Sequence, residues 1–372
     1  MGWLSGVLWS GGAILALFGV MLFVYQEKLL YFPDMPFRDP DDNPKGMRHP
    51  GEFGLPFEDV FMTTADGVRI HGWLLKQPQA DMVATIVYFH GNAGNIGFRL
   101  PSAGEMYRKL GANVFLVEYR GYGKSRGTPS EHGLLLDALA ALDALRGTGS
   151  GGSGGGGGCG GCGSGSIGRR GGGGGGGGGG LGVDPTQLIV FGRSLGGAVA
   201  IAAADAAPSK VAAVVVENTF LSVPHMVDVV MPLLRPLKPL VLRMKWPSDE
   251  RMPRLVQPVL FVAGQLDELV PPWHMERLFE LCAAPKRMLR VRRGTHNDTW
   301  LRAGDRYYEV MREFIAQTAV QRVATAESCI EGDAADGQLV VQPGDAGAVD
   351  AIPTMPKLGP TLPARPERRK ED

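Results

Sequence analysis

The stretch LIVFGRSLGG, residues 188–197, decides the fold of this 372-residue chain. Its apolar, β-branched first half predicts a buried strand, and the alanine-rich residues up to 207 predict a helix. A strand that turns sharply into a helix around Gly-x-Ser-x-Gly exposes the serine hydroxyl and offers backbone N–H groups at the helix start. Gly192 and Gly196 leave room for the close approach of strand and helix. The stretch therefore predicts that Ser194 is a nucleophile, which needs a base and an acid from elsewhere in the chain.

The rest of the chain alternates between predicted strands and helices. Strands are predicted at 83–89, 113–118, 211–216, 258–263 and 287–291, and helices at 103–110, 130–145, 272–281 and 300–318. Residues 57–64 and 68–75 flank an Asp-Gly turn, which predicts an antiparallel hairpin. This order is typical of an α/β fold, in which a mostly parallel sheet has helices on both faces and an antiparallel edge.

Two strand ends supply candidate partners for Ser194. In an open α/β sheet, ligands collect at the carboxyl ends of the strands. Asp267 follows the strand at 258–263, and His296 follows the strand at 287–291. The chain order serine, aspartate, histidine is that of α/β-hydrolases, in which the histidine takes the serine proton and the aspartate orients the imidazole. Glu268 is the alternative acid, but Asp267 is favoured by its nearer position and shorter side chain.

A hydrolase of this kind also needs donors for the carbonyl oxygen that becomes negative during attack. The N–H of Leu195, directly after the nucleophile, is one candidate. The loop after the strand at 83–89 begins His90-Gly91, and its Asn92 N–H is the second candidate. Together these residues predict an oxyanion hole next to Ser194.

Composition excludes several other functions. Lysine plus arginine equals aspartate plus glutamate, at 38 each, so no basic field attracts nucleic acid. Cys159 and Cys162 form a C-x-x-C inside a glycine run, without a second pair or a histidine nearby. We therefore expect no metal, no cofactor and no nucleic-acid partner.

The first residues predict a membrane anchor. Residues 1–26 carry no charged side chain and exceed the length that spans a bilayer as a helix. Basic residues after this segment favour a catalytic domain on the cytoplasmic side. The sequon at Asn297, one residue after His296, favours the same side, because a glycan there would crowd the site.

The chain then divides by composition. We expect a linker at 27–56, a hydrolase domain at 57–319 and a disordered tail at 320–372. Residues 147–180 are mostly glycine and predict a disordered insertion in that domain. Residues 218–257 are apolar with a basic rim and lie where this fold carries its cap, or lid. Such a lid suits an acyl chain and an anionic membrane, although its apolar residues could equally pack only on the core.

Five motifs resemble a known family, the membrane-anchored α/β-hydrolase domain-containing protein 13 group. They are FHGNAGNI (89–96), EYRGYGKS (118–125), FGRSLGGAVAI (191–201), ENTFLS (217–222) and GTHNDTW (294–300). The resemblance covers most of residues 15–317. The glycine-rich insertion and the longer tail depart from the family pattern.

The resemblance implies a serine hydrolase with one N-terminal transmembrane helix and with its catalytic triad at Ser194, Asp267 and His296. Related membrane-associated members are acyl-protein (palmitoyl) thioesterases, and members of the group are described with the catalytic domain outside the cytoplasm. We therefore expect cleavage of an acyl ester or thioester through an acyl-enzyme, with an acylated protein or a lipid as substrate. A serine peptidase, a lipid esterase and a non-catalytic binding module on the same fold remain as alternatives.

Overall fold

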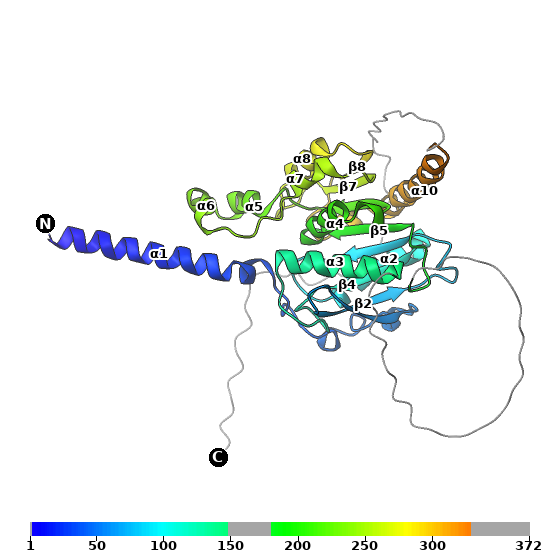
Figure 1. Cartoon of the computed structure of the whole chain (residues 1–372), viewed down its shortest axis with the longest axis horizontal. Helices are drawn as coiled ribbons and strands as arrows, with labels where there is room; N and C mark the ends of the chain where they lie inside the picture. Colours follow the sequence, from blue (N-terminus) through cyan, green and yellow to red (C-terminus); the bar gives the residue numbers. More distant parts are fainter. Residues whose placement is uncertain (1, 148–179, 329–372) are drawn as a thin grey trace, which may run out of the picture. The chain divides into compact units, whose positions relative to one another are not determined.

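The computed structural model describes residues 2–147 and 180–328. The strands in this part form one sheet, in the order β1-β2-β4-β3-β5-β6-β7-β8. β2 pairs antiparallel with β1 and with β4, and all other neighbouring pairs are parallel (Figure 1). The prediction of a mostly parallel sheet with an antiparallel edge hairpin is confirmed. The strand bounds are Glu58–Thr63 (β1), Arg69–Leu75 (β2), Thr85–Phe89 (β3), Asn113–Glu118 (β4), Leu188–Arg193 (β5), Ala213–Glu217 (β6), Val259–Gly264 (β7) and Lys286–Val291 (β8).

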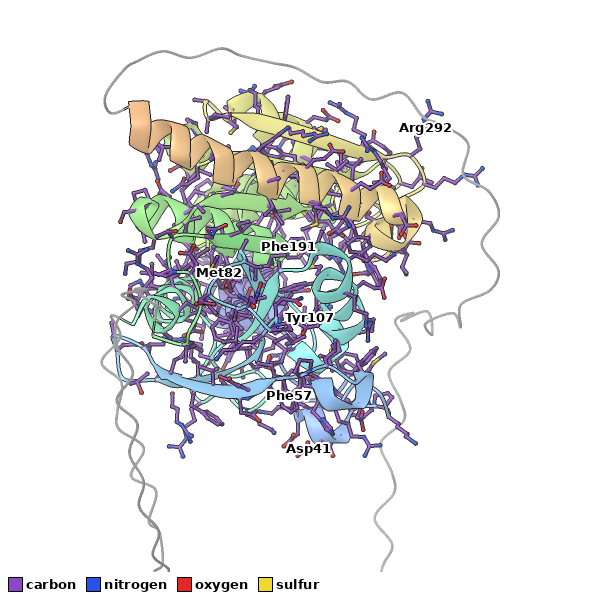
Figure 2. The ribbon with its side chains drawn as sticks, turned by 90° about the vertical axis from the view of Figure 1, so that its right-hand side faces the viewer. Asp41, Phe57, Met82, Tyr107, Phe191 and Arg292 are labelled. Atoms are coloured by element: carbon purple, nitrogen blue, oxygen red, sulfur yellow. The ribbon has the colours of Figure 1, made fainter. Side chains whose placement is uncertain are left out.

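Both faces of the sheet are covered, as the unbroken apolar runs predict. The strands β3 to β7 are buried along their whole length. In β5, Leu188 and Val190 belong to one buried cluster, and Ile189 and Phe191 belong to the other. Figure 2 shows Phe191 inside the molecule and Arg292, just after β8, pointing outward. The outer strand β1 instead alternates between exposed and buried residues.

Helices pack on each face. The first buried cluster takes in side chains of α3 (Glu131–Arg146), α4 (Leu195–Ala206) and α8 (Trp273–Leu281). The second takes in side chains of α2 (Leu100–Leu110) and α10 (Asp305–Ser328). Figure 2 shows α10, in orange, crossing its face of the sheet. The connections leave the carboxyl ends of β3, β5, β6, β7 and β8 at one edge, where the predicted site residues lie.

Capping residues and glycines with positive φ mark the ends of the helices. α3 begins at Ser130, whose hydroxyl accepts a hydrogen bond from the Gly133 N–H, and it ends at Gly147, which has a left-handed backbone. The single helix predicted at 300–318 is wrong in detail, because Gly304, with φ of 55°, separates α9 (Thr299–Ala303) from α10. A residue with positive φ interrupts a right-handed helix, and glycine adopts it without strain.

The predicted membrane anchor forms a helix, α1, which extends from Gly2 to Leu30. Within the described part of the chain, however, no helix is long and apolar enough to cross a membrane. The predicted transmembrane helix is thus not found. In the last turns of α1, Gln26, Glu27 and Lys28 are polar, and the Gln26 side chain is buried against protein.

The segment predicted as a cap contains short helices. They are α5 (Val223–Val230), η5 (Pro232–Leu237), α6 (Lys238–Val241), α7 (Ser248–Arg251) and η6 (Met252–Arg254). Prolines at 232 and 239 stand at the starts of η5 and α6. From Met244 onward, side chains such as Trp246 are buried in the main core, whereas Leu233 and Leu240 are exposed. The expected insertion and tail lie almost entirely outside the described residues.

In the segment 31–56, the structure has two short 3-10 helices, η1 (Pro40–Asp42) and η2 (Pro50–Phe53). η3 (Ile96–Arg99) follows the β3 loop, and η4 (Pro208–Lys210) follows α4. The Asn43 and Asn95 side chains hydrogen-bond to each other and fasten the segment to the β3 loop. This loop also carries Asn92, so the segment supports the predicted oxyanion hole.

Candidate active site

Ser194 occupies a sharp turn between β5 and α4. Its backbone has φ of 56° and ψ of −122°, a conformation that a residue other than glycine adopts only under strain. A Cβ on Gly196 would collide with the Phe89 carbonyl, and one on Gly192 would collide with the Gly196 backbone. The two glycines therefore allow the strand and the helix to meet at the turn, as the sequence predicts. The Ser194 residue is partly exposed although both neighbours are buried.

Asp267 and His296 form a buried pair. The His296 Nδ1–H donates to Asp267 Oδ2 at 2.8 Å, and the two residues are 4% and 7% exposed. The other oxygen, Asp267 Oδ1, accepts from the N–H groups of Leu269 and Val270 at 2.9 and 2.8 Å. A carboxylate held at both oxygens fixes the imidazole tautomer, so that Nε2 is left to act as a base.

The alternative acid lies outside this pair. Glu268 is exposed, and its carboxylate accepts only from the backbone N–H of His296, at 3.4 Å. It does not contact the imidazole nitrogens through any hydrogen bond in the described part of the chain. The geometry therefore favours Asp267 as the acid.

The predicted oxyanion residues share a cavity with Ser194. Asn92, Ser194 and Leu195 line an apolar cavity of about 360 Å³. A Cβ placed on Gly91 would lie 3.8 Å from the Ser194 Cβ, so the loop after β3 passes directly beside Ser194. The Asn92 carbonyl accepts from the Phe32 N–H at 2.9 Å, which fixes this loop. The arrangement brings both candidate donors to one place.

The Ser194 hydroxyl is not hydrogen-bonded to His296 among the residues that the structure describes. Catalytic hydrogen bonds often tighten only when a substrate binds. The two residues are instead joined through the end of β6. The Ser194 N–H donates to the Glu217 carbonyl at 2.9 Å, and the Thr219 hydroxyl donates to the Ser194 carbonyl at 2.7 Å.

Asn218 completes this connection, and sequence reasoning assigned it no role. Its side-chain amide donates to the carbonyls of Thr295 and His296 at 3.0 and 3.1 Å, and to the Thr299 hydroxyl at 3.0 Å. Its Oδ1 accepts from the Gly264 N–H, at the end of β7, at 2.8 Å. One side chain thus fastens the strand that leads to Asp267 and the loop that carries His296. Its position directly after a buried strand was the signal that could have found it.

A buried ionic network lies next to the Ser194 turn. Arg193 Nε donates to Glu217 Oε1 at 2.8 Å, and the Tyr307 hydroxyl donates to Glu217 Oε2 at 2.5 Å. Burial, reinforced by the Glu217 carboxylate, raises the pKa of Tyr307 well above its usual value. Tyr307 therefore stays protonated and keeps its donor role. The residues just before Ser194 and Asn218 are thereby fixed.

No group of three or more metal-ligating side chains that could hold an ion occurs within residues 2–147 and 180–328. Cys159 and Cys162 lie outside the described residues. A second cleft, of about 670 Å³, is lined by Leu221, His225 and Trp273 among others, and it contains none of the predicted site residues.

Three features define the α/β-hydrolase class. They are the order of the strands in the eight-stranded sheet, the serine in the turn from strand to helix, and the Asp–His pair at the carboxyl ends of the strands. The chain belongs to the alpha/beta hydrolase family, whose match spans residues 86–356. The WAV2 protein of Arabidopsis thaliana, an alpha/beta hydrolase domain-containing protein, is 33% identical over 86% of this chain and 97% of its own length. Protein bem46 of Schizosaccharomyces pombe is 34% identical over 82% of this chain and 90% of its own length. The narrower group that the motifs resemble is not confirmed by these relatives.

Two further proteins are similar to this chain, one in sequence and one in fold. The uncharacterized membrane protein YNL320W of Saccharomyces cerevisiae is 30% identical over 85% of this chain and 98% of its own length. The Pyrococcus furiosus esterase Pf2001 superposes with a TM-score of 0.51 at 16% identity, over 72% of this chain and 95% of that one. At this identity the likeness concerns the fold alone.

Proposed function

We propose that this protein is a serine hydrolase that cleaves an acyl ester or thioester through an acyl-enzyme. One observation carries the proposal: the strained Ser194 turn opens into an apolar cavity that Asn92 and Leu195 also line. The buried Asp267–His296 hydrogen bond of 2.8 Å supports it. Membership of the alpha/beta hydrolase family supports hydrolysis in general.

The proposed reaction has two halves. In the first, Ser194 Oγ attacks the acyl carbonyl carbon while His296 Nε2 takes the hydroxyl proton. The N–H groups of Asn92 and Leu195 stabilise the oxyanion, and the leaving alcohol or thiol departs with the proton from His296. In the second, His296 removes a proton from water, which attacks the acyl-enzyme and releases the carboxylic acid and the Ser194 hydroxyl. Asp267 stabilises the imidazolium in both halves.

An acylated protein, such as a palmitoyl-protein, or a lipid is the proposed substrate. The lining of the cavity is largely apolar, which suits the hydrocarbon part of such a molecule rather than a peptide. A serine peptidase on the same triad is the alternative. A panel of acyl thioesters, acylglycerols and peptides separates the two, and turnover of peptides alone would refute the proposal.

Labelling with a fluorophosphonate probe tests the nucleophile. Ser194→Ala removes only the hydroxyl, so labelling and ester hydrolysis should disappear while the thermal unfolding temperature changes little. Ser125→Ala is not a suitable control, because that hydroxyl is buried and bonded to the Glu118 carbonyl. Ser209→Ala, in the short helix η4, is the better control, and it should label like the unaltered chain. Labelling that survives in Ser194→Ala would refute the assignment.

Attachment to a membrane through α1 is part of the proposal. Exposed apolar side chains on α1, among them Leu17, Val20 and Val24, support it, as does the relative named a membrane protein. Liposome flotation tests it: the full chain should float, and a chain with Leu17, Val20 and Val24 changed to serine should remain at the bottom of the gradient. Equal flotation of both chains would contradict this role for α1.

A further inference from the structure

The cavity over Ser194 has walls from two parts of the chain that lie far apart in sequence. One wall comes from α5 and α6, in the segment predicted as a cap. The other comes from α1. Ser194, Asn92 and Leu195 lie between these walls, so the cavity is continuous with the proposed reaction centre.

The α1 wall is one stripe of the helix. Leu22, Gln26, Leu29 and Leu30 line the cavity, at the spacing that places residues on one face of a helix. Other side chains of the same helix, such as Val24, do not line it. Figure 1 shows the carboxyl-terminal part of α1 beside α5 and α6.

Polar contacts hold this wall in place. Gln26, only 4% exposed, accepts from the N–H groups of Arg243 and Met244, both at 2.8 Å. The Arg243 guanidinium donates to both carboxylate oxygens of Glu27 at 2.8 Å. One turn further, the Trp246 indole N–H donates to the Tyr31 hydroxyl at 3.0 Å. A buried amide and a charge-assisted ion pair fix the position of α1 against the chain after α6.

The wall formed by α5 and α6 is also largely apolar. Val223, Met226, Val227 and Val230 follow one another along a single face of α5 and line the cavity. The charged lining residue Lys238 is neutralised, since its ammonium donates to Asp228 at 2.6 Å and to the Pro224 carbonyl at 3.1 Å. Both walls therefore offer mainly apolar contact to a substrate in the cavity that Ser194 and Asn92 also line.

We propose that α1 is part of the substrate site and forms the wall against which the acyl chain lies, so that this helix sets the preferred acyl-chain length. The inference rests on the proposed hydrolase function and adds the substrate class, a medium or long unbranched acyl chain. A cavity of about 360 Å³ is within the size range of small-ligand pockets. Each methylene that enters it is removed from water, which raises kcat/KM about fourfold.

The test compares two positions on α1 with matched exposure. Leu29 is 52% exposed and lines the cavity, whereas Val24 is 51% exposed and does not. The measured quantity is the ratio of kcat/KM for p-nitrophenyl dodecanoate to that for p-nitrophenyl butyrate. The full-length protein is used, and each ester is kept below its critical micelle concentration. Leu29→Trp fills the cavity from the α1 side, and Met226→Trp fills it from the α5 side.

In Leu29→Trp and Met226→Trp the ratio should fall about tenfold or more, since the loss of room for two methylenes at about fourfold each suffices. In Val24→Trp it should stay within about twofold of the unaltered chain. A ratio in Leu29→Trp equal to that in Val24→Trp overturns the role of α1, even if Met226→Trp lowers it. An unaltered chain that hydrolyses no ester of any length refutes the hydrolase proposal instead, so the two failures are distinguishable.

Discussion

Asn218→Asp is expected to separate the positioning of the triad from general stability. The change keeps the shape of the side chain and its tolerance of the positive φ of 47°. It removes the two N–H donors that the amide shares among the Thr295 carbonyl, the His296 carbonyl and the Thr299 hydroxyl, and it sets a carboxylate oxygen against the two carbonyls. At about 1 kcal/mol for each N–H donor lost, the free energy of unfolding should fall by at least about 2 kcal/mol.

The effect on catalysis should be larger than stability alone explains. The loop that carries His296 loses its attachment to the strand next to Ser194, and a displacement of about 1 Å between reacting groups costs about 100-fold in rate. We therefore expect kcat/KM for p-nitrophenyl butyrate to fall about 100-fold at a temperature where the variant is fully folded.

Asn113→Asp is the matched control. Asn113 is equally buried and its amide donates to the Ala80 carbonyl and the Thr85 hydroxyl, at 2.8 and 3.1 Å. It begins β4 and thus lies at the amino edge of the parallel strands, away from the site. Its loss should lower the free energy of unfolding by about 2 kcal/mol and leave kcat/KM within about threefold. Equal losses of kcat/KM in both variants, or none in Asn218→Asp, would refute the reasoning.

Two more changes test the acid and the pH dependence of stability. Asp267→Asn should lower kcat about 10³- to 10⁴-fold, because the asparagine amide favours the wrong His296 tautomer. Glu268→Gln should change kcat less than about threefold. Steady-state kinetics measure both, and the larger loss in Glu268→Gln would make Glu268 the acid. Burial, with His225 nearby, lowers the pKa of His274 to about 4. The native state therefore keeps His274 neutral, so stability is complete above pH about 6.5 and up to about 3 kcal/mol is lost as the pH falls to about 4. Denaturant titrations from pH 4 to 7 should show this loss in the unaltered chain and a flatter curve in His274→Gln; parallel curves would contradict it.

Local signals predicted the sheet and the candidate site residues. The apolar run before Ser194 requires a strand, and the glycines around it require a tight turn, so β5 and its turn follow from a few residues. Asp267 and His296 were found because each directly follows a strand of the same sheet. Asn218 satisfies the same rule, but an amide that positions other residues carries no motif that distinguishes it in the sequence.

Contacts between distant residues were beyond sequence reasoning. Gln26 and Arg243 are separated by more than 200 residues, and nothing in either segment alone indicates that one lies on the other. An uncharged, apolar run predicts a membrane helix from its composition, whereas the burial of Gln26 depends on a partner that composition does not reveal. The break at Gly304 was missed because the apolar spacing continues on both sides of it.

The contact between α1 and the chain after α6 has a consequence for how the protein is produced. Residues 22–31 leave the ribosome long before residues 241–246 are made, so this wall can close only after β1 to β6 have been synthesised. A chain shortened at the amino end to improve solubility would keep the nucleophile turn and the Asp–His pair, yet its cavity would be open on one side. Such a preparation would still react with a small probe. Its preference for acyl-chain length, however, would reflect the truncation and not the full-length protein.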